Sequence, residues 1–178
     1  TSGIDWAYYG TRNWNDPNLI AYMESHDEER LIYRNLEFGN ETNGGHNTTN
    51  LDIALERVKA ASALYYAIPG PKMIWQFGEL GYDKSINLNG RTGEKPLPWA
   101  SSNDGLDYNT DEDRLRLYKV TAALAKLKTN YNLFNTTGFE LDQSQSLVKQ
   151  VMLMNAPYTS DPADASEMNA VIVGNFNV

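Results

Sequence analysis

A short run of ionisable residues follows an apolar segment near the beginning of the chain. Residues 19–23 read LIAYM, and residues 24–30 read ESHDEER. Within this run His26 stands beside Asp27, so a hydrogen-bond donor adjoins a carboxylate that stays ionised at neutral pH. Sugar hydroxyl groups need such a mixture of donors and acceptors. These residue types favour a site for a polar ligand, although the same run is also typical of a solvated helix start.

Two apolar segments are expected to position this site. Residues 19–23 and 73–77 are short continuous apolar runs, which are typical of strands covered on both faces in a parallel sheet. Between them, apolar residues recur at three- and four-residue spacing over residues 51–68, which predicts an amphipathic helix. A strand, helix and strand in this order make a parallel pair, and ligands bind beyond the carboxyl ends of such strands. We therefore expect Asp27 and Glu79 to share one edge of the sheet.

The remaining patterns change character near residue 132. Residues 27–38 can form a short helix, and a second amphipathic helix is predicted from residue 111 to residue 131, with Thr110 as its cap. Strands are predicted at residues 139–141, 147–154 and 170–178, with turn-rich residues 157–166 before the last of them. We therefore expect an α/β part in residues 1–131 and an all-β part in residues 132–178.

Composition limits the class of protein. The chain has 178 residues, of which 41% are hydrophobic and 21% charged, as in globular proteins. Its net charge of −8 argues against a nucleic-acid partner, which would require clustered Lys and Arg. No apolar run approaches the roughly 18 residues of a membrane span. Without cysteine, disulfides and thiolate metal sites are excluded. The first residues do not have the features of a signal peptide, and any targeting signal would lie upstream of residue 1, so the compartment stays unknown.

MESHDEER, at residues 23–30, resembles the last signature region of the α-amylase family, glycoside hydrolase family 13. Other segments match the family in the same order. IPGPKMIWQFGEL is similar to the eighth barrel strand and its Gly-Glu ending, GRTGEKPLPW to the loop that follows, and residues 110–133 to the eighth barrel helix. AVIVGNFNV is similar to an early strand of the family's C-terminal β-domain. The resemblance covers residues 19–178.

This resemblance implies a C-terminal piece of an enzyme: the last two strand-helix units of a (β/α)8 TIM barrel, followed by part of an antiparallel β-sandwich domain. It implies that Asp27 is the catalytic residue that stabilises the transition state and that His26 donates a hydrogen bond to the sugar. We expect Arg30, Glu79 and Trp99 to bind substrate as well. The family's nucleophile and general acid follow strands that this sequence does not contain, so the chain alone is expected to be inactive.

The expected function is cleavage of α-1,4-glucosidic bonds in starch or glycogen by a retaining mechanism, with an α-glucan or maltooligosaccharide as partner. Two alternatives stay open: a piece of a 1,4-α-glucan branching enzyme, which carries a similar signature, and a non-catalytic carbohydrate-binding remnant. The chain requires no cofactor, and no loop has a metal-ligand spacing, although Ca²⁺ can bind in the full-length enzyme. Because an incomplete barrel has open strand edges, we also expect a homodimer through those edges.

Several further side chains bear on the expected site. Trp75, Tyr82 and Trp99 could stack on sugar rings, although the place of Trp75 within an expected strand favours a core position. Glu24 precedes Asp27 by three residues and is expected to point to the opposite side. His46 lies in a loop rich in Gly and Asn, and we give it no role.

Overall fold

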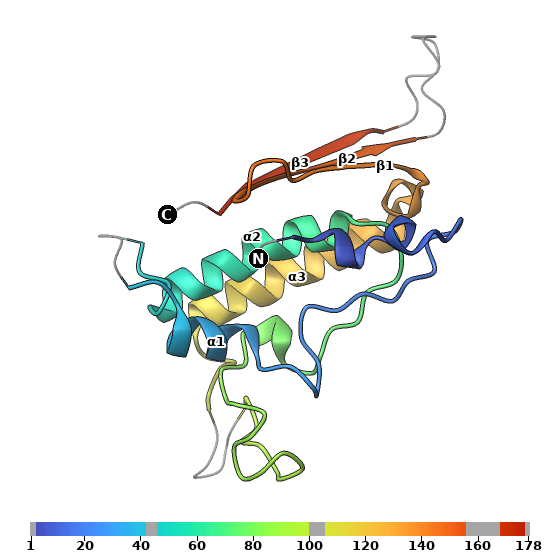
Figure 1. The fold of residues 1–178 in the computed structure, drawn as a ribbon. Helices are drawn as coiled ribbons and strands as arrows, with labels where there is room; N and C mark the ends of the chain where they lie inside the picture. Colours follow the sequence, from blue (N-terminus) through green and yellow to red (C-terminus); the bar gives the residue numbers. More distant parts are fainter. Residues whose placement is uncertain (1–2, 42–45, 100–105, 156–167, 177–178) are drawn as a thin grey trace. The chain divides into compact units, whose positions relative to one another are not determined.

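The computed structural model describes residues 3–41, 46–99, 106–155 and 168–176. In these residues the chain forms three α-helices and one three-stranded sheet (Figure 1). The helices are α1 (Leu31–Phe38), α2 (Leu51–Ala67) and α3 (Glu112–Asn130), and the strands are β1 (Gly138–Asp142), β2 (Val148–Met154) and β3 (Ala170–Asn175). Short 3₁₀ turns lie at Asp5–Ala7, Tyr9–Arg12, Gly78–Leu80 and Asn132–Asn135.

The structure confirms the two longer helices and the strands after residue 132, of which residues 177–178 lie outside the described part. Helix α1 begins at Leu31, four residues after the predicted start at residue 27. Helix α2 begins after Asn50, whose side-chain oxygen accepts a hydrogen bond from the Asp52 amide at 2.9 Å. Helix α3 starts one residue later than predicted because Asp111, and not Thr110, caps it: Asp111 Oδ1 accepts the amides of Asp113 and Arg114 at 2.9 and 3.2 Å. The turn-rich residues 157–166 lie outside the described part of the chain, as do residues 42–45 and 100–105 of the two long loops.

The two apolar segments before the site are not regular strands. They meet at one parallel bridge between Ala21 and Lys72, so the parallel direction is confirmed. The expected burial on both faces is wrong, since Ile20 is 60% exposed and Ile74 is 45% exposed. A strand is maintained by neighbours that pair with its backbone groups, and a single bridge leaves most of these groups unpaired. Whether the chain is part of a barrel followed by a sandwich stays a prediction.

The chain forms two compact units, and each is considered by itself. Unit 1 comprises residues 1–21, 60–73 and 123–177, and unit 2 comprises residues 22–59 and 74–122. These units are groups of residues that contact one another in space, and each combines segments from different parts of the sequence. The boundary near residue 132 divides the sequence into two domains, and it stays a prediction.

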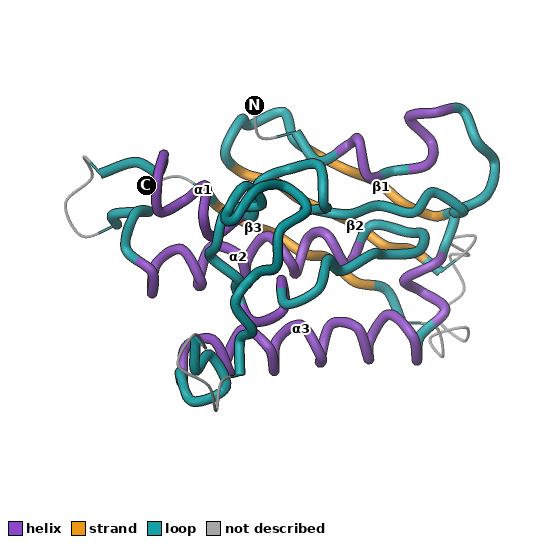
Figure 2. The backbone as a smooth tube through the Cα atoms, turned by 90° about the horizontal axis from the view of Figure 1, so that it is seen from below, coloured by secondary structure: helices purple, strands orange, loops and turns teal. Residues whose placement is uncertain are grey.

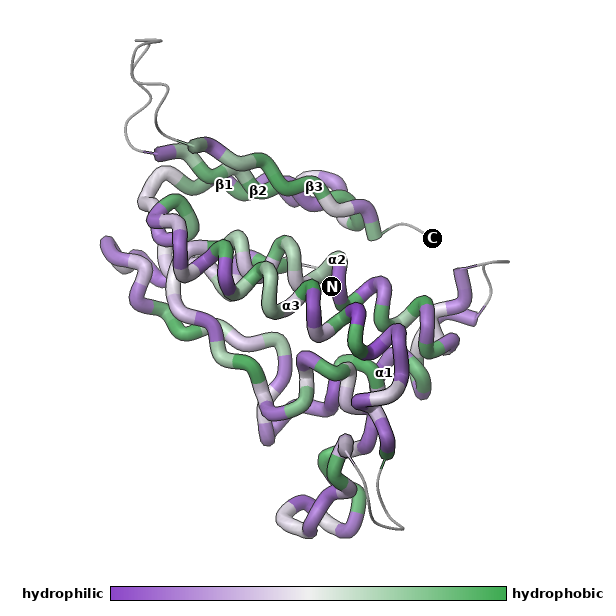
Figure 3. The backbone as a smooth tube through the Cα atoms, turned by 180° about the vertical axis from the view of Figure 1, so that it is seen from behind, coloured by the Kyte–Doolittle hydropathy of each residue, from purple (hydrophilic) through white to green (hydrophobic). Residues whose placement is uncertain are grey.

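Unit 1 is built on the antiparallel sheet, whose strand order is β1-β2-β3 (Figure 2). Val151 and Leu153 of β2 are fully buried, and they pack on Leu64 and Ala67 of α2. More covered and more exposed side chains alternate along β2 and β3, as expected of a sheet with one covered face. Most residues of these two strands are apolar (Figure 3). Hydrophobic contact between the sheet and the second half of α2 therefore forms the core of unit 1.

Unit 2 is built on apolar side chains from all three helices. Ile32 of α1, Leu55 of α2 and Leu117 of α3 are each at most 1% exposed and pack together. Gly81 lies against them with a φ of +64°, and a Cβ at this position would collide with the Leu55 side chain. This core fixes the residues around Gly81, which lead into the site described below. No helix in the described residues is long and apolar enough to cross a membrane.

Candidate functional site

The backbone turn of residues 25–28 directs Asp27 outward. The Asp27 amide donates a hydrogen bond to Ser25 Oγ at 3.1 Å, and the Ser25 hydroxyl donates in turn to the Glu28 carboxylate. Ser25 is buried, whereas the side chain of Asp27 is 63% exposed. A short polar side chain that bonds the backbone two residues later is a local turn device. The carboxylate of Asp27 is therefore accessible to a ligand.

Two basic side chains contact the Asp27 carboxylate. Arg91 donates from Nη2 to Asp27 Oδ1 at 2.6 Å and to the backbone oxygen of His26 at 3.3 Å. Nε2 of His26 lies 3.3 Å from Asp27 Oδ2. All three side chains are more than half exposed, and ion pairs of this kind contribute at most about 1 kcal/mol to stability. A polar ligand can therefore replace Arg91 at Asp27 at low cost.

Arg30 forms the floor of the site. Its Nη1 donates to Glu24 Oε1 at 3.0 Å and to the backbone oxygen of Gln76 at 2.9 Å. Its guanidinium carbon lies 5.6 Å from the ring centre of Trp75 and 4.9 Å from that of Tyr82. The side chain is only 5% exposed. Arg30 is thus fixed by an ion pair, a carbonyl and two aromatic rings.

Glu24 connects this floor to helix α1. Its second carboxylate oxygen accepts the amide of Leu31, the first residue of α1, at 2.9 Å. Burial raises the pKa of Glu24 above its ordinary value, although the Leu31 amide and the charge of Arg30 favour the ionised form. A Cβ at Gly78 would collide with Glu24 Oε1, so glycine is required for this close approach. Glu24 is buried while Asp27 is exposed, so the two carboxylates do not form a pair.

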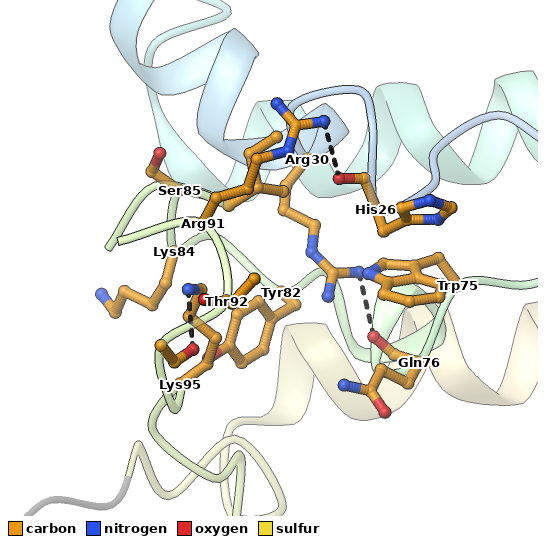
Figure 4. A pocket seen from close by; sticks show the side chains of 12 residues that line it. His26, Arg30, Trp75, Gln76, Tyr82, Lys84, Ser85, Arg91, Thr92 and Lys95 are labelled. Atoms are coloured by element: carbon orange, nitrogen blue, oxygen red, sulfur yellow. Dashed lines mark hydrogen bonds between the residues drawn. The ribbon is translucent and has the colours of Figure 1, made fainter. Parts of the chain in front are cut away.

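His26, Arg30 and Arg91 border a cavity of about 170 Å³ that lies within unit 2 (Figure 4), whereas Asp27 and Glu24 are not among the residues that line it. It is lined by His26, Arg30, Trp75, Gln76, Tyr82, Lys84, Ser85, Ile86, Arg91, Thr92, Gly93 and Lys95. The rings of His26 and Trp75 adjoin each other, with their centres 5.7 Å apart. Trp75 therefore forms a wall of the pocket, and the expectation that it belongs to the core is wrong.

The loop of residues 84–95 supplies most of the remaining wall, and Glu29 holds its beginning. The Glu29 carboxylate accepts hydrogen bonds from Ser85 Oγ at 2.7 Å, the Ile86 amide at 3.1 Å and Asn87 Nδ2 at 3.2 Å. An ionised carboxylate strengthens each of these bonds. Glu29 thus fixes the first part of the loop to the segment that carries His26 and Asp27.

Lys95 holds the end of the same loop. Its ammonium group donates to the backbone oxygens of Leu88, Gly90 and Gly93 at 2.6, 2.7 and 2.9 Å. An ammonium has three N–H donors, so these bonds use all of them. Arg91, which contacts Asp27, lies between the positions that Lys95 ties together. The loop is therefore ordered before any ligand binds.

Two of the residues predicted to bind substrate lie away from the pocket lining. Glu79 belongs to the 3₁₀ turn Gly78–Leu80, and its charge contributes to the raised pKa of Glu24. Trp99 is 51% exposed, and its ring meets that of Phe77 edge-on at 5.1 Å. The structure thus places His26 and Arg30 in the pocket lining and Asp27 next to it, in contact with His26 and Arg91, but Glu79 and Trp99 are not part of this group.

Sequence reasoning assigned no role to Arg91, Glu29 or Lys95. Arg91 and Lys95 lie in a segment without periodicity, and their partners are set by how that loop folds. Glu29 belongs to the acidic run, where nothing distinguishes it from Glu28. The one usable signal was the high density of Gly and Asn around Arg91, which is typical of a tightly turning loop.

In the described part of the chain, no group of three or more His, Asp or Glu side chains is arranged to hold a metal ion. A scan of the chain against protein-family models finds no match, and neither does a search of the curated proteins.

Proposed function

We propose that this chain is part of a retaining glycoside hydrolase of the α-amylase type that cleaves α-1,4-glucosidic bonds in starch or glycogen. One observation carries this proposal: an exposed carboxylate, Asp27, contacts His26 and Arg91, and both of these residues line a pocket that has Trp75 as an aromatic wall. Acceptor, donor and aromatic face together are the groups that bind sugars. The resemblance of residues 23–30 to the family's last signature region supports the same assignment.

In this proposal Asp27 accepts hydrogen bonds from sugar hydroxyls, and these bonds strengthen as the ring becomes positively charged in the transition state. His26 presents a ring nitrogen 3.3 Å from the same carboxylate and can donate to a neighbouring hydroxyl. A retaining mechanism also needs a nucleophile and a general acid about 5–5.5 Å apart. Glu24 is not suited to either role because Arg30 and the Leu31 amide occupy its carboxylate. Both groups are expected from segments outside this sequence.

Arg91 has a defined role in the same proposal. Without ligand it neutralises Asp27, and a bound sugar takes its place on the carboxylate. Because the pair is exposed, this exchange costs little. Arg91 is thus a positioning residue that holds the Asp27 carboxylate beside the pocket while the site is empty.

Binding of maltoheptaose to the chain, measured by isothermal titration calorimetry, tests the proposal. We expect Asp27→Asn to weaken binding about 10- to 100-fold, because a hydrogen bond to a charged group contributes about 1.5–3 kcal/mol. Asp16→Asn, an exposed carboxylate outside the site, is the control and should bind as the wild type does. Equal affinity of the Asp27→Asn variant and the wild type would refute the assignment.

The chain alone is expected to release no reducing sugar from starch above an Asp27→Ala control, since it contains one of the three carboxylates. Within a complete enzyme, Asp27→Asn should lower kcat by orders of magnitude and leave folding largely unchanged.

The predicted homodimer is tested separately by light scattering, where a stable monomer would exclude it.

A further inference from the structure

The pocket carries cationic side chains and, among the described residues that line it, no carboxylate. Four of its twelve lining residues are Arg30, Lys84, Arg91 and Lys95, and His26 adds a further basic group. The whole chain, by contrast, has 23 acidic and 15 basic residues. Glu24 and Asp83, which pair with Arg30 and Lys84, are at most 11% exposed, whereas Asp27, which pairs with Arg91, is exposed but is not one of the lining residues. The lining itself therefore supplies cationic donors and no carboxylate.

Two of the four cations are structural. The charge of Arg30 is matched by Glu24, and Lys95 uses all three of its donors on backbone oxygens. Lys84 and Arg91 differ from them. Among the residues that the structure describes, Lys84 Nζ contacts Asp83 Oδ1 alone, at 3.0 Å, and Arg91 donates from Nη2 alone. Both keep N–H groups that a ligand can engage, because an ammonium has three donors and a guanidinium has five.

The partner of Lys84 is itself held away from the pocket. Asp83 Oδ2 accepts a hydrogen bond from Arg114 at 2.7 Å, and Asp83 Oδ1 accepts one from the Tyr108 hydroxyl. Burial opposes ionisation of Asp83, but these hydrogen bonds and the charges of Lys84 and Arg114 together lower its pKa. Asp83 therefore stays charged behind the wall, while the Lys84 ammonium lines the cavity and is 38% exposed.

Besides sugar hydroxyls, the donors of this wall also suit an anionic group. A sugar hydroxyl both donates and accepts, whereas a phosphate monoester offers three strong acceptor oxygens and negative charge. The cavity of about 170 Å³ is also smaller than the roughly 300–1,000 Å³ of pockets that enclose drug-sized ligands. It therefore holds one compact group, such as a single sugar unit of a glucan with its substituent.

We propose that the pocket binds the phosphate of a phosphorylated glucose unit, with the phosphate on Lys84 and Arg91 and the sugar ring beside Trp75. Lys84, Arg91 and Trp75 all line this cavity, and in Figure 4 Lys84 and Trp75 lie on opposite sides of it. The proposal rests on the proposed function in one respect, that a glucan supplies the glucose unit. The loop of residues 84–95 is already ordered by Glu29 and Lys95, so the ligand does not bear the entropic cost of ordering it.

The probes are glucose 6-phosphate, glucose and inorganic phosphate, each titrated into the chain by calorimetry in 50 mM and 300 mM NaCl. We expect glucose 6-phosphate to bind at least tenfold more tightly than either of the others, and more weakly at the higher salt. Lys84→Gln should weaken the binding of glucose 6-phosphate at least fivefold. Lys119→Gln, an exposed lysine of α3 in the same unit, should leave it unchanged.

Equal binding of glucose and glucose 6-phosphate would overturn the proposal. Inorganic phosphate binding as tightly as glucose 6-phosphate would overturn it as well, because the pocket would then hold an adventitious ion only. If maltoheptaose binds through Asp27 but glucose 6-phosphate binds no more tightly than glucose, the proposed function stands and the phosphate site is refuted. If glucose 6-phosphate binds more tightly than glucose but maltoheptaose does not bind, the phosphate site stands and the glucan assignment is refuted.

Discussion

Replacing Arg30 with Met removes the cation from the floor of the pocket while keeping a long apolar side chain. The change leaves the Glu24 carboxylate buried without a countercharge and the Gln76 carbonyl without its donor. It also removes the cationic contacts with Trp75 and Tyr82. The backbone of helix α1 next to it is retained, so the effect reports mainly on this buried cluster.

The expected cost follows from the burial of the pair. Breaking a buried ion pair by removing one partner costs about 3–5 kcal/mol. For a chain of this length each kcal/mol lowers Tm by about 2–4 °C, which gives a fall of about 6–20 °C. The cost should be smaller at pH 5 than at pH 7.5. Burial already raises the pKa of Glu24, and loss of Arg30 raises it further. For a carboxyl group whose pKa is raised by folding, the contribution to stability is full below the pKa of the unfolded chain, near 4.3. This contribution is lost as the pH rises through the pKa of the folded state. At pH 5 more of the buried Glu24 is therefore neutral than at pH 7.5, and the missing countercharge matters less.

Urea unfolding followed by circular dichroism at both pH values measures this cost. Arg34→Met is the matched control, because Arg34 is exposed on the same helix and its replacement should change stability by less than about 0.5 kcal/mol. Adding Glu24→Gln to Arg30→Met should recover part of the loss, since the buried charge is then absent. A loss below about 1 kcal/mol at pH 7.5, or an equal loss at both pH values, would refute the reasoning.

Two further predictions concern other buried or clamped groups. Burial lowers the pKa of Lys72 to about 7. The contribution of Lys72 to the free energy of unfolding is therefore largest above the pKa of lysine in the unfolded chain, and it is lost as the pH falls through 7. Lys72→Met should therefore raise stability by roughly 1–3 kcal/mol at pH 6 and by less at pH 9, and equal gains in thermal melts would contradict this. Glu29→Gln should loosen the loop of residues 84–95 and speed amide hydrogen exchange of Ile86 at least tenfold. Glu37→Gln, exposed on α1, is the control, and unchanged protection of Ile86 in the Glu29→Gln variant would exclude the clamp.

The predictions that held rest on local signals. Helix α2 was predicted from spacing within one segment, and its structure confirms the start after Asn50 and the end before Pro69. The turn that exposes Asp27 is likewise made by Ser25, two residues away. Such features depend on neighbours within a few residues, so the order of amino acids is sufficient to specify them.

The predictions that failed depend on partners far away in the chain. Residues 19–23 and 73–77 have the apolar composition of buried strands, but pairing at one bridge does not make them strands. Trp75 is a large aromatic residue within an apolar segment, as is typical of a core residue. It nevertheless lines the pocket because Arg30 and His26 lie beside it. Composition indicates that such a residue is apolar, whereas its neighbours in space decide whether it is covered.

The sequence by itself determined the helices, the later strands and the pair of His26 and Asp27 as the place where chemistry is expected. Only the tertiary structure decided which groups complete that site. Arg91 reaches Asp27 across 64 positions of sequence, and Glu29 holds a loop more than 50 positions away. The physical reason is that a loop without periodicity has no preferred local conformation. Its course is fixed by the local bonds of Lys95 and by long-range hydrogen bonds to Glu29 and Asp27, and the partners in the long-range bonds come together only when the chain is folded.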